Sequence, residues 1–296
     1  MNILVMGATG MFGSGIVRAL NNLNQNIKIT AVVRDMNKAK EMKLHQLHNV
    51  ALVVGDMENP DSLSKIMKNI NKLFLVSPMV NNLDVLEMNV FDAAKQQNVN
   101  HILKLYGAVK HNDDLLIKLH RRSLIHLEQS GLNWSLISPN SVMETSLLSY
   151  AESIKTENAI DGCTGQHKIG MVALDDVLVA SAHLLAGDKL ISGRDYQLTG
   201  PQSLNFFEIA AIFSKCLNKN IQYIDHSEEA CEKLLMEHMN MSKQAVEMQI
   251  MCHFRAWKQD GADFVTDTFT EITGKPSTSL ESWIKKNKDM FLCANG

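Results

Sequence analysis

The chain has 296 residues, of which 45% are hydrophobic and 21% charged. This is ordinary globular usage, so the composition excludes an intrinsically disordered protein, and the length predicts one large fold with a smaller attached region. A formal net charge of -3 lacks the basic excess of proteins that bind a nucleic-acid backbone, so direct nucleic-acid binding is not expected.

The sequence also argues against metal and membrane functions. Its five cysteines are scattered, without a C-x-x-C pair or the spacing of zinc ligands, so no metal site is expected. The first residues have strand character, with no basic segment before a long apolar run, and no apolar stretch approaches the roughly twenty residues of a membrane span. We therefore expect a cytoplasmic protein without membrane contact.

Short apolar runs alternate with segments of helical periodicity over the first two thirds of the chain. The expected strands are residues 3–6, 27–33, 50–54, 73–76, 101–105 and 134–137. The expected helices between them are residues 12–23, 62–70, 83–97 and 115–129. Strands that alternate with helices of this length form right-handed βαβ units. The pattern predicts an α/β fold with a Rossmann-type doubly wound parallel sheet.

The alternation weakens after residue 139. We expect a helix over 142–158, glycine-rich turns over 162–170, a helix that ends at 185 and a strand over 195–199. A helix over 205–217, capped by Ser203, a short strand and further helices follow. This predicts a nucleotide-binding domain over 1–200, in which 141–170 contributes to the substrate region, and a smaller, mostly helical substrate or lid region over 201–296. Its methionines fit either a deformable lid or ordinary core packing.

A glycine-rich turn follows the first expected strand and opens the first expected helix. Glycines allow a backbone to approach a diphosphate closely, and the free N–H groups at a helix start favour negative charge. The spacing is G-x-x-G-x-x-G, which the preceding strand and following helix make specific. The turn residues expected to hold a dinucleotide diphosphate are Gly7, Thr9, Gly10, Met11, Phe12 and Gly13.

Arg34 follows the second expected strand, where a Rossmann fold faces the adenosine ribose. A guanidinium there can hold a 2'-phosphate, and Lys38 adds a second positive charge. These residues favour NADP(H). Asp35 is the counter-argument, because its carboxylate could accept hydrogen bonds from the ribose hydroxyls of NAD(H), which we consider the less favoured cofactor.

Asp56 and Met57 follow the third expected strand and complete the candidate adenosine site. The Asp56 carboxylate is placed to reach the adenine amino group. Its alternative role is that of an ordinary loop acid, and the sequence leaves both open.

Several phrases in a fixed order carry a family resemblance. They comprise Gly7 to Gly13, 32–35, 55–56, 73–78, 99–105, 128–134, 137–140 and 196–201. With them the chain resembles the NmrA-like family of atypical short-chain dehydrogenases/reductases, which includes NADPH:quinone reductases, triphenylmethane reductases and cofactor-sensing regulators without catalysis. The resemblance implies that Ser77, Pro78, Pro139 and Asn140 border the nicotinamide and the substrate.

Related extended dehydrogenases carry a catalytic Tyr and Lys four residues apart, but the matching positions here are His120 and Leu124. Tyr106 and Lys110 have the same spacing, but the intervening Gly107 makes a continuous helix there unexpected. The resemblance implies that His120 could donate a proton or orient the acceptor, or be structural. It likewise implies that the Tyr106 hydroxyl points at the substrate or packs at a strand end.

The favoured hypothesis is hydride transfer from NADPH to a small conjugated acceptor such as a quinone, which needs less acid assistance than an isolated ketone. The main alternative is a non-catalytic NADP(H) sensor that binds a partner protein. An epimerase or biosynthetic reductase ranks last because Leu124 replaces the lysine. A homodimer or a regulatory partner stays open.

Overall fold

The computed structural model describes residues 1–23, 26–107 and 115–292. A seven-stranded sheet has the order β10-β6-β5-β4-β1-β2-β3, and all neighbouring strands in it are parallel. The strands are β1 (Asn2–Val5), β2 (Lys28–Val33), β3 (Val50–Val54), β4 (Lys72–Leu75), β5 (His101–Leu105), β6 (Trp134–Pro139) and β10 (Asp195–Leu198). The predicted Rossmann-type doubly wound sheet is therefore confirmed.

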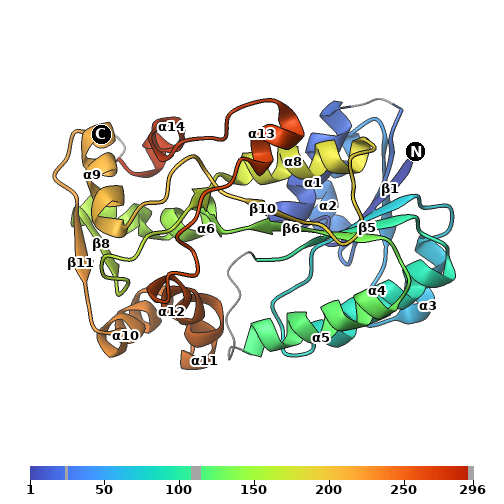
Figure 1. The fold of residues 1–296 in the computed structure, drawn as a ribbon, viewed down its shortest axis with the longest axis horizontal. Coiled ribbons are helices and arrows are strands. Elements are labelled where there is room, and N and C mark those ends of the chain that lie inside the picture. Colours follow the sequence, from blue (N-terminus) through green and yellow to red (C-terminus); the bar gives the residue numbers. More distant parts are fainter. Residues whose placement is uncertain (24–25, 108–114, 293–296) are drawn as a thin grey trace.

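Helices cover both faces of this sheet (Figure 1). On one face, α1 (Met11–Leu23) and α8 (Leu174–Ala186) bury apolar residues such as Ile16 and Leu184 against the strands. On the other face lie α3 (Pro60–Ile66), α4 (Leu83–Gln96) and α5 (Leu115–Gln129), with Phe91 and Leu127 in the core. Strands buried on both faces need continuous apolar runs, which explains why these strands stand out in the sequence.

A second hydrophobic core lies beside the sheet domain. It combines residues between Met143 and Ala173 with residues between Phe206 and Phe291. The elements before α8 are β7 (Ser141–Val142), α6 (Met143–Leu147), η2 (Leu148–Tyr150), α7 (Ala151–Thr156), β8 (Ala159–Gly162) and β9 (Met171–Val172). Those after β10 are α9 (Phe206–Leu217), β11 (Gln222–Asp225), α10 (Glu228–Met239), α11 (Lys243–Val246), η3 (Glu247–Met251), α12 (Cys252–Lys258), α13 (Thr268–Thr273), α14 (Leu280–Lys286) and η4 (Lys288–Met290). Between β2 and β3 lie α2 (Met36–Glu41) and η1 (Leu44–Gln46).

One prediction about this second part was confirmed only in part, and another was wrong. The single helix expected over 142–158 is divided into β7, α6, η2 and α7. Val142 is paired with Val172 between β7 and β9, and the 3-10 turn η2 separates α6 from α7. Hydroxyls of Thr145, Ser149 and Ser153 each bond to a carbonyl three residues earlier within this stretch.

The predicted cap of α9 was wrong. Asn205 caps the helix, because its side chain accepts from the Glu208 N–H while the Glu208 carboxylate accepts from the Asn205 N–H. Ser203 stands two residues too early to reach the first turn, and its hydroxyl donates to Asp263 instead, at 2.6 Å.

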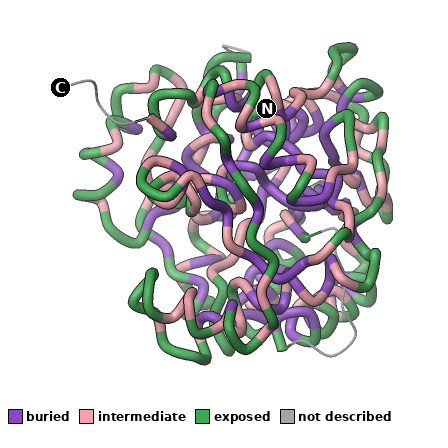
Figure 2. Tube along the Cα trace, turned by 90° about the vertical axis from the view of Figure 1, so that its left-hand side faces the viewer, coloured by how far each residue is buried: buried purple, intermediate pink, exposed green. Residues whose placement is uncertain are grey.

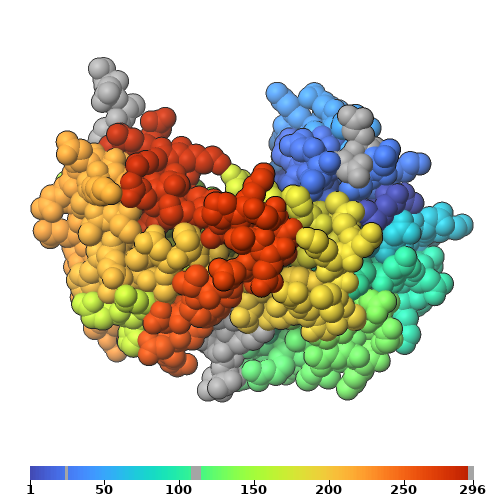
Figure 3. All heavy atoms as spheres, turned by 45° about the horizontal axis from the view of Figure 1, so that its top comes forward, coloured from blue at the N-terminus to red at the C-terminus, as the bar shows by residue number. Residues whose placement is uncertain are grey.

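Buried residues run through the interior and exposed ones lie around it (Figure 2). The space-filling view shows a notch along the upper side, between the N-terminal residues in blue and the C-terminal residues in red (Figure 3). In the described ranges, no helix is both long enough and apolar enough to cross a membrane. Nor do the residues described there gather three His, Cys, Asp or Glu side chains into a group that could hold a metal ion.

His101 on β5 makes stability depend on pH. Its ring bonds to the Ser135 hydroxyl at 2.8 Å, and burial, with a smaller effect of the Lys72 charge, lowers its pKa from 6.5 to about 4. Unfolded His101 therefore binds a proton that the folded ring does not bind, so stability is full above pH 6.5 and falls as the pH drops toward 4.

We predict that His101→Gln reduces proton uptake on unfolding by about one proton in this window. Urea unfolding at pH 7.5, 6 and 5 measures the slope. His48→Gln, which changes an exposed histidine, should leave the slope as it is. An unchanged slope in His101→Gln would contradict the role of this ring.

Candidate functional site

A cavity of about 260 Å³ lies at the carboxyl ends of β1, β2, β3 and β4. β1 is hydrogen-bonded to both β2 and β4, so the strand order reverses there, which is where open α/β sheets bind ligands. Twelve of the predicted cofactor residues line this cavity, namely Gly7, Thr9, Gly10, Met11, Phe12, Gly13, Arg34, Lys38, Asp56, Met57, Ser77 and Pro78. Their roles toward a ligand stay predictions.

The glycine-rich turn is a tight cradle between β1 and α1. Gly7 has φ +71°, a left-handed conformation that favours glycine. A Cβ on Gly13 would lie 2.2 Å from the Gly7 carbonyl oxygen, so a side chain there would displace the turn. Since α1 begins at Met11, the N–H groups of its first turn have no intrahelical partner and lie at the cavity wall. This arrangement fits a diphosphate.

Arg34 and Asp35, adjacent in sequence, take different places. Arg34 and Lys38 line the cavity and are exposed, so their positive charges stand at its rim. The Asp35 carboxylate caps α2, with Oδ1 accepting from the Asn37 N–H at 2.8 Å and the Lys38 N–H at 3.4 Å. Asp35 does not line the cavity. Of the charged residues that directly follow β2, those that line the cavity are therefore the positive ones, whereas Asp56 and Glu58 add negative charges after β3.

Asp56 lines the cavity and also shapes its own loop. Its Oδ1 accepts from the Glu58 N–H at 3.0 Å, and its backbone N–H bonds to the Ser62 hydroxyl at 3.3 Å. One carboxylate oxygen is thus used locally. Both roles expected for Asp56, in adenine recognition and in the loop, stay open.

Pro139 and Asn140 do not line the cavity. Asn140 is buried, and its Nδ2 donates to the carbonyls of Ala262 at 2.8 Å and Gly170 at 3.2 Å. It ties the end of β6 to the C-terminal part of the chain. Its Oδ1 has no hydrogen-bond partner in the part of the chain that the structure describes.

His120 and Tyr106 lie together beside this cavity but do not line it. Their rings meet edge to face, with centroids 5.1 Å apart. Lys104 Nζ lies 3.1 Å from His120 Nδ1 and 2.7 Å from Glu87 Oε1. The Ser77 hydroxyl, from the cavity wall, donates to the same Glu87 oxygen at 2.7 Å. A polar network thus joins His120 to the cavity, whereas Lys110 of the Tyr106/Lys110 spacing lies outside the described residues.

Sequence reasoning missed several residues of this region. The cavity is also lined by Met6, Val32, Gly55, Glu58, Val76 and Leu86. Most of them stand at or just after strand ends, a position that could have identified them. Glu87 and Lys104 were missed too, although each carries a charge at a core position of an apolar pattern, on α4 and on β5.

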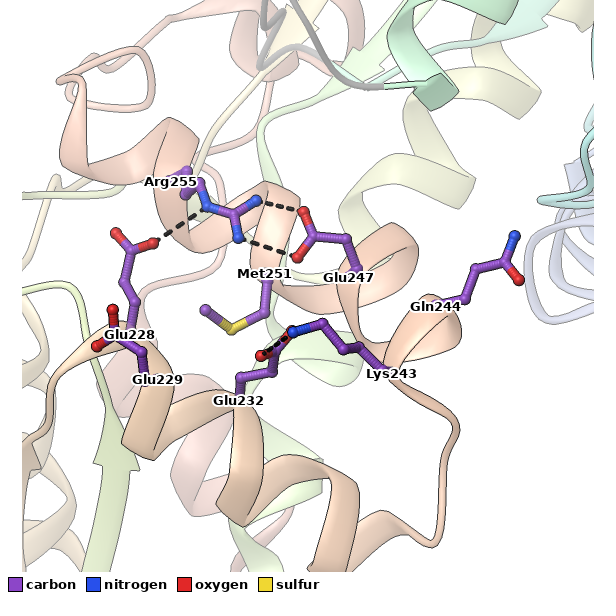
Figure 4. Close-up of a pocket in the computed structure, with 8 residues that line it drawn as sticks. All are labelled: Glu228, Glu229, Glu232, Lys243, Gln244, Glu247, Met251 and Arg255. Carbon is purple, nitrogen blue, oxygen red and sulfur yellow. Dashed lines mark hydrogen bonds and ion pairs between the residues drawn. The ribbon is translucent and has the colours of Figure 1, made fainter.

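A second cavity, of about 550 Å³, lies among α10, α11, η3 and α12. Arg255 there contacts Glu228 and makes a two-bond contact with Glu247, while Lys243 bonds to Glu232, and Met251 lies between these pairs (Figure 4). Acids outnumber bases in the lining, yet both bases are already engaged with carboxylates. This cavity is built mainly from ion pairs and is separate from the strand-end site.

A comparison with protein families tests the resemblance that the sequence motifs indicate. A model described as the NmrA-like family matches residues 1–117. The resemblance to the NmrA-like family is confirmed. The matched part contains the glycine-rich turn, Arg34, Ser77 and β1 to β5.

Individual proteins resemble the chain over nearly its whole length. The NAD(P)H azoreductase of Xenophilus azovorans is 26% identical, with 98% of this chain and 99% of the relative covered. An NADPH-dependent quinone oxidoreductase from Escherichia coli, solved with NADPH, has a TM-score of 0.88 at 22% identity, covering 97% of this chain and all of that one. Triphenylmethane reductase from Citrobacter sp., solved with NADP(H), has a TM-score of 0.86 at 22% identity, covering 96% and 99%. These structures share the fold of this chain.

The cradle geometry predicts different effects for two glycine substitutions. Gly13→Ala places a methyl group 2.2 Å from the Gly7 oxygen, whereas Gly10→Ala places one 3.3 Å from the same oxygen. Overpacking of the first kind costs about 1–3 kcal/mol, so Gly13→Ala should weaken NADPH binding about tenfold or more. Gly10→Ala should weaken it less.

Fluorescence titration with NADPH measures both dissociation constants, and thermal unfolding reports on the fold. Equal, wild-type affinity in both variants would contradict the assignment of this turn as the diphosphate cradle.

Proposed function

We propose that this chain is an NADP(H)-dependent oxidoreductase that reduces a small conjugated acceptor, such as a quinone or an azo compound. The observation that carries the proposal is the cavity at the strand ends, where the Gly13 cradle and the Arg34 and Lys38 charges face the same space. The full-length similarity to an azoreductase supports the reductase assignment.

The proposed cofactor placement follows the cavity wall. The first turn of α1 binds the diphosphate through its N–H groups, and Arg34 with Lys38 binds the 2'-phosphate. The Ser77–Pro78 segment then borders the nicotinamide, because it follows β4 on the other side of β1. The Asp35 carboxylate caps α2 and does not line the cavity, which leaves the proposed phosphate position to Arg34 and Lys38.

Bound NADPH would supply the hydride, while the residues of the chain align the acceptor and stabilise the charge that develops on it. Negative charge that develops on a quinone is delocalised over its ring, so a hydrogen bond suffices where an isolated ketone needs an acid. His120 and Tyr106 are the polar side chains proposed to contact the acceptor. Glu87 connects His120 to Ser77 at the cavity wall. Asn140 supports the proposed acceptor region by fixing the end of β6 to Ala262, and Pro139 precedes it at the end of β6.

Residues 201–296, with 141–170, are proposed as the acceptor-binding region. The shared hydrophobic core of these two segments supports this division. Met251 lies in that core, Met248 packs on Leu83, Leu116 and Leu119, and Met239 is exposed. The methionines thus include both core positions and a surface position.

Arg34 should decide cofactor selectivity. Arg34→Ala removes charge-assisted hydrogen bonds, which contribute about 1.5–3 kcal/mol, and should raise the Kd of NADPH about 10–100-fold while leaving the Kd of NADH nearly unchanged. Titration of wild type and variant with both nucleotides measures this.

Asp35→Asn is the matched control, because asparagine also caps helices and should change neither Kd much. Loss of NADH binding in Asp35→Asn, with NADPH binding intact in Arg34→Ala, would instead support the ribose-binding role of Asp35.

The proposed reaction is tested by NADPH oxidation with a panel of quinones, azo dyes and simple ketones. Turnover should appear with the conjugated acceptors and be absent with ketones. Gly13→Ala should lose turnover in parallel with its loss of NADPH affinity, which excludes a contaminating reductase. A panel without turnover at high protein concentration, in the presence of saturable NADPH binding, would leave a binding protein and reject the reductase.

A further inference from the structure

Glu87 of α4 and Lys104 of β5 form an ion pair beneath the cavity edge. Their side chains are both 0% exposed, with 2.7 Å between Glu87 Oε1 and Lys104 Nζ. Removing two charges from water is costly, and an apolar pair of similar size often serves a fold equally well. The surrounding core is apolar, with Ile102 and Val90 in the same cluster. Stability alone therefore does not account for this pair.

Glu87 is the centre of the network. Its Oε1 accepts from Lys104 and from the Ser77 hydroxyl, and its Oε2 lies in contact with the Ser123 hydroxyl. Burial raises the pKa of Glu87, but the Lys104 charge and the hydrogen bonds outweigh this and lower the pKa to about 2. An ionised carboxylate surrounded by donors holds Ser77 in one orientation at the cavity wall.

Lys104 also determines the state of His120. Burial lowers the pKa of Lys104, and the charge and hydrogen bond of Glu87 oppose this shift. Paired with the Glu87 carboxylate as an ammonium, Lys104 has three protons and no lone pair, so the His120 Nδ1 atom, 3.1 Å from Nζ, accepts. The ring proton is then on Nε2. Burial and the Lys104 charge lower the pKa of His120, while Glu87 opposes the shift. Within the described ranges, the titratable groups that face this ring are Lys104 of β5, Glu87 of α4 and Tyr106 after β5.

We propose that Lys104 is a positioning residue that holds His120 as the neutral tautomer with its proton on Nε2, ready to donate a hydrogen bond to the acceptor. This role rests on the proposed reductase function. Hydride addition leaves an electron pair on the acceptor oxygen, the Nε2–H group donates to that oxygen, and water then supplies the proton that completes the hydroquinone. His120 keeps its own proton throughout.

The pair explains why this histidine can act over a wide pH range. A solvated imidazole changes charge near neutral pH, and its donor and acceptor positions then change with it. Beside the Lys104 ammonium, a second positive charge on His120 is unfavourable, so the ring stays neutral with a fixed donor. Electrostatic stabilisation by a preorganised N–H group requires such a fixed orientation.

The first test is nitrogen NMR of the histidine rings in the protein without nucleotide, with His120→Gln to assign the signal. Wild type should show neutral His120 protonated on Nε2 only, with a pKa below the ordinary histidine value. In Lys104→Met, the pKa of the ring should rise relative to wild type, because Glu87 Oε1, 3.6 Å from Nδ1, no longer has its cation. An unchanged His120 signal in Lys104→Met would overturn the proposal.

The double variant Glu87→Gln/Lys104→Met is the matched control. It removes both charges together, so it avoids an uncompensated buried charge and should fold even if the single variant does not. Its His120 should be neutral again but without a fixed tautomer, which NMR distinguishes from wild type. A double variant with the wild-type Nε2–H tautomer would mean that other contacts set the ring, and would also overturn the proposal.

The second test is the pH profile of the reductase reaction. Wild-type kcat should be flat between pH 6 and 8, whereas Lys104→Met should lose about tenfold in kcat or more and gain a new pH dependence, with little change in the KM for NADPH. A parallel loss in kcat and in NADPH affinity, with no new pH dependence, would indicate a merely structural role. Absence of turnover in wild type, with the NMR result as expected, would reject the reductase function and not the control of His120 by Lys104.

Discussion

The inner strands of the central sheet must bury both of their faces, because the strands run parallel and helices connect them. The connecting loops can then leave the sheet only at the carboxyl or the amino ends of its strands. The loops after β1, β2, β3 and β4 all lie at the carboxyl ends of the strands. They bring together the Gly7–Gly13 turn, Arg34, Asp56 and Ser77. Residues separated by seventy positions meet there as a result of sheet packing alone.

Much of this arrangement is readable in the sequence, because it depends on local patterns. Apolar runs locate β3 and β5 to the residue, and the glycine spacing identifies the turn before α1. The stretch 142–158 is helical only from 143 to 156 and is interrupted at η2. Its first residue, Val142, pairs instead with Val172, a contact that apolar periodicity does not register. The Asn205 cap was within reach of the sequence, since Glu208 stands three residues later, as a capping box requires.

Contacts between distant elements were beyond the sequence. Nothing in the local pattern states that Glu87 on α4 meets Lys104 on β5, or that Asn140 bonds to Ala262. The place of the Asp35 side chain was likewise not readable from its neighbours in the sequence. Its position beside Arg34 suggested competition for a ribose, but the carboxylate is used to start α2. Such choices depend on three-dimensional reach, and they decide which of two neighbouring charges faces a ligand.

Met248, on the π-helical turn η3, packs on Leu83 of α4 and on Leu116 and Leu119 of α5. These two helices also carry Glu87 and His120. A substitution at Met248 would therefore alter the packing of the two helices that carry the Glu87 carboxylate and the His120 imidazole. A loop graft from a relative that changes the size of residue 248 needs a compensating change at Leu83, Leu116 or Leu119, so these four positions form one unit for library design.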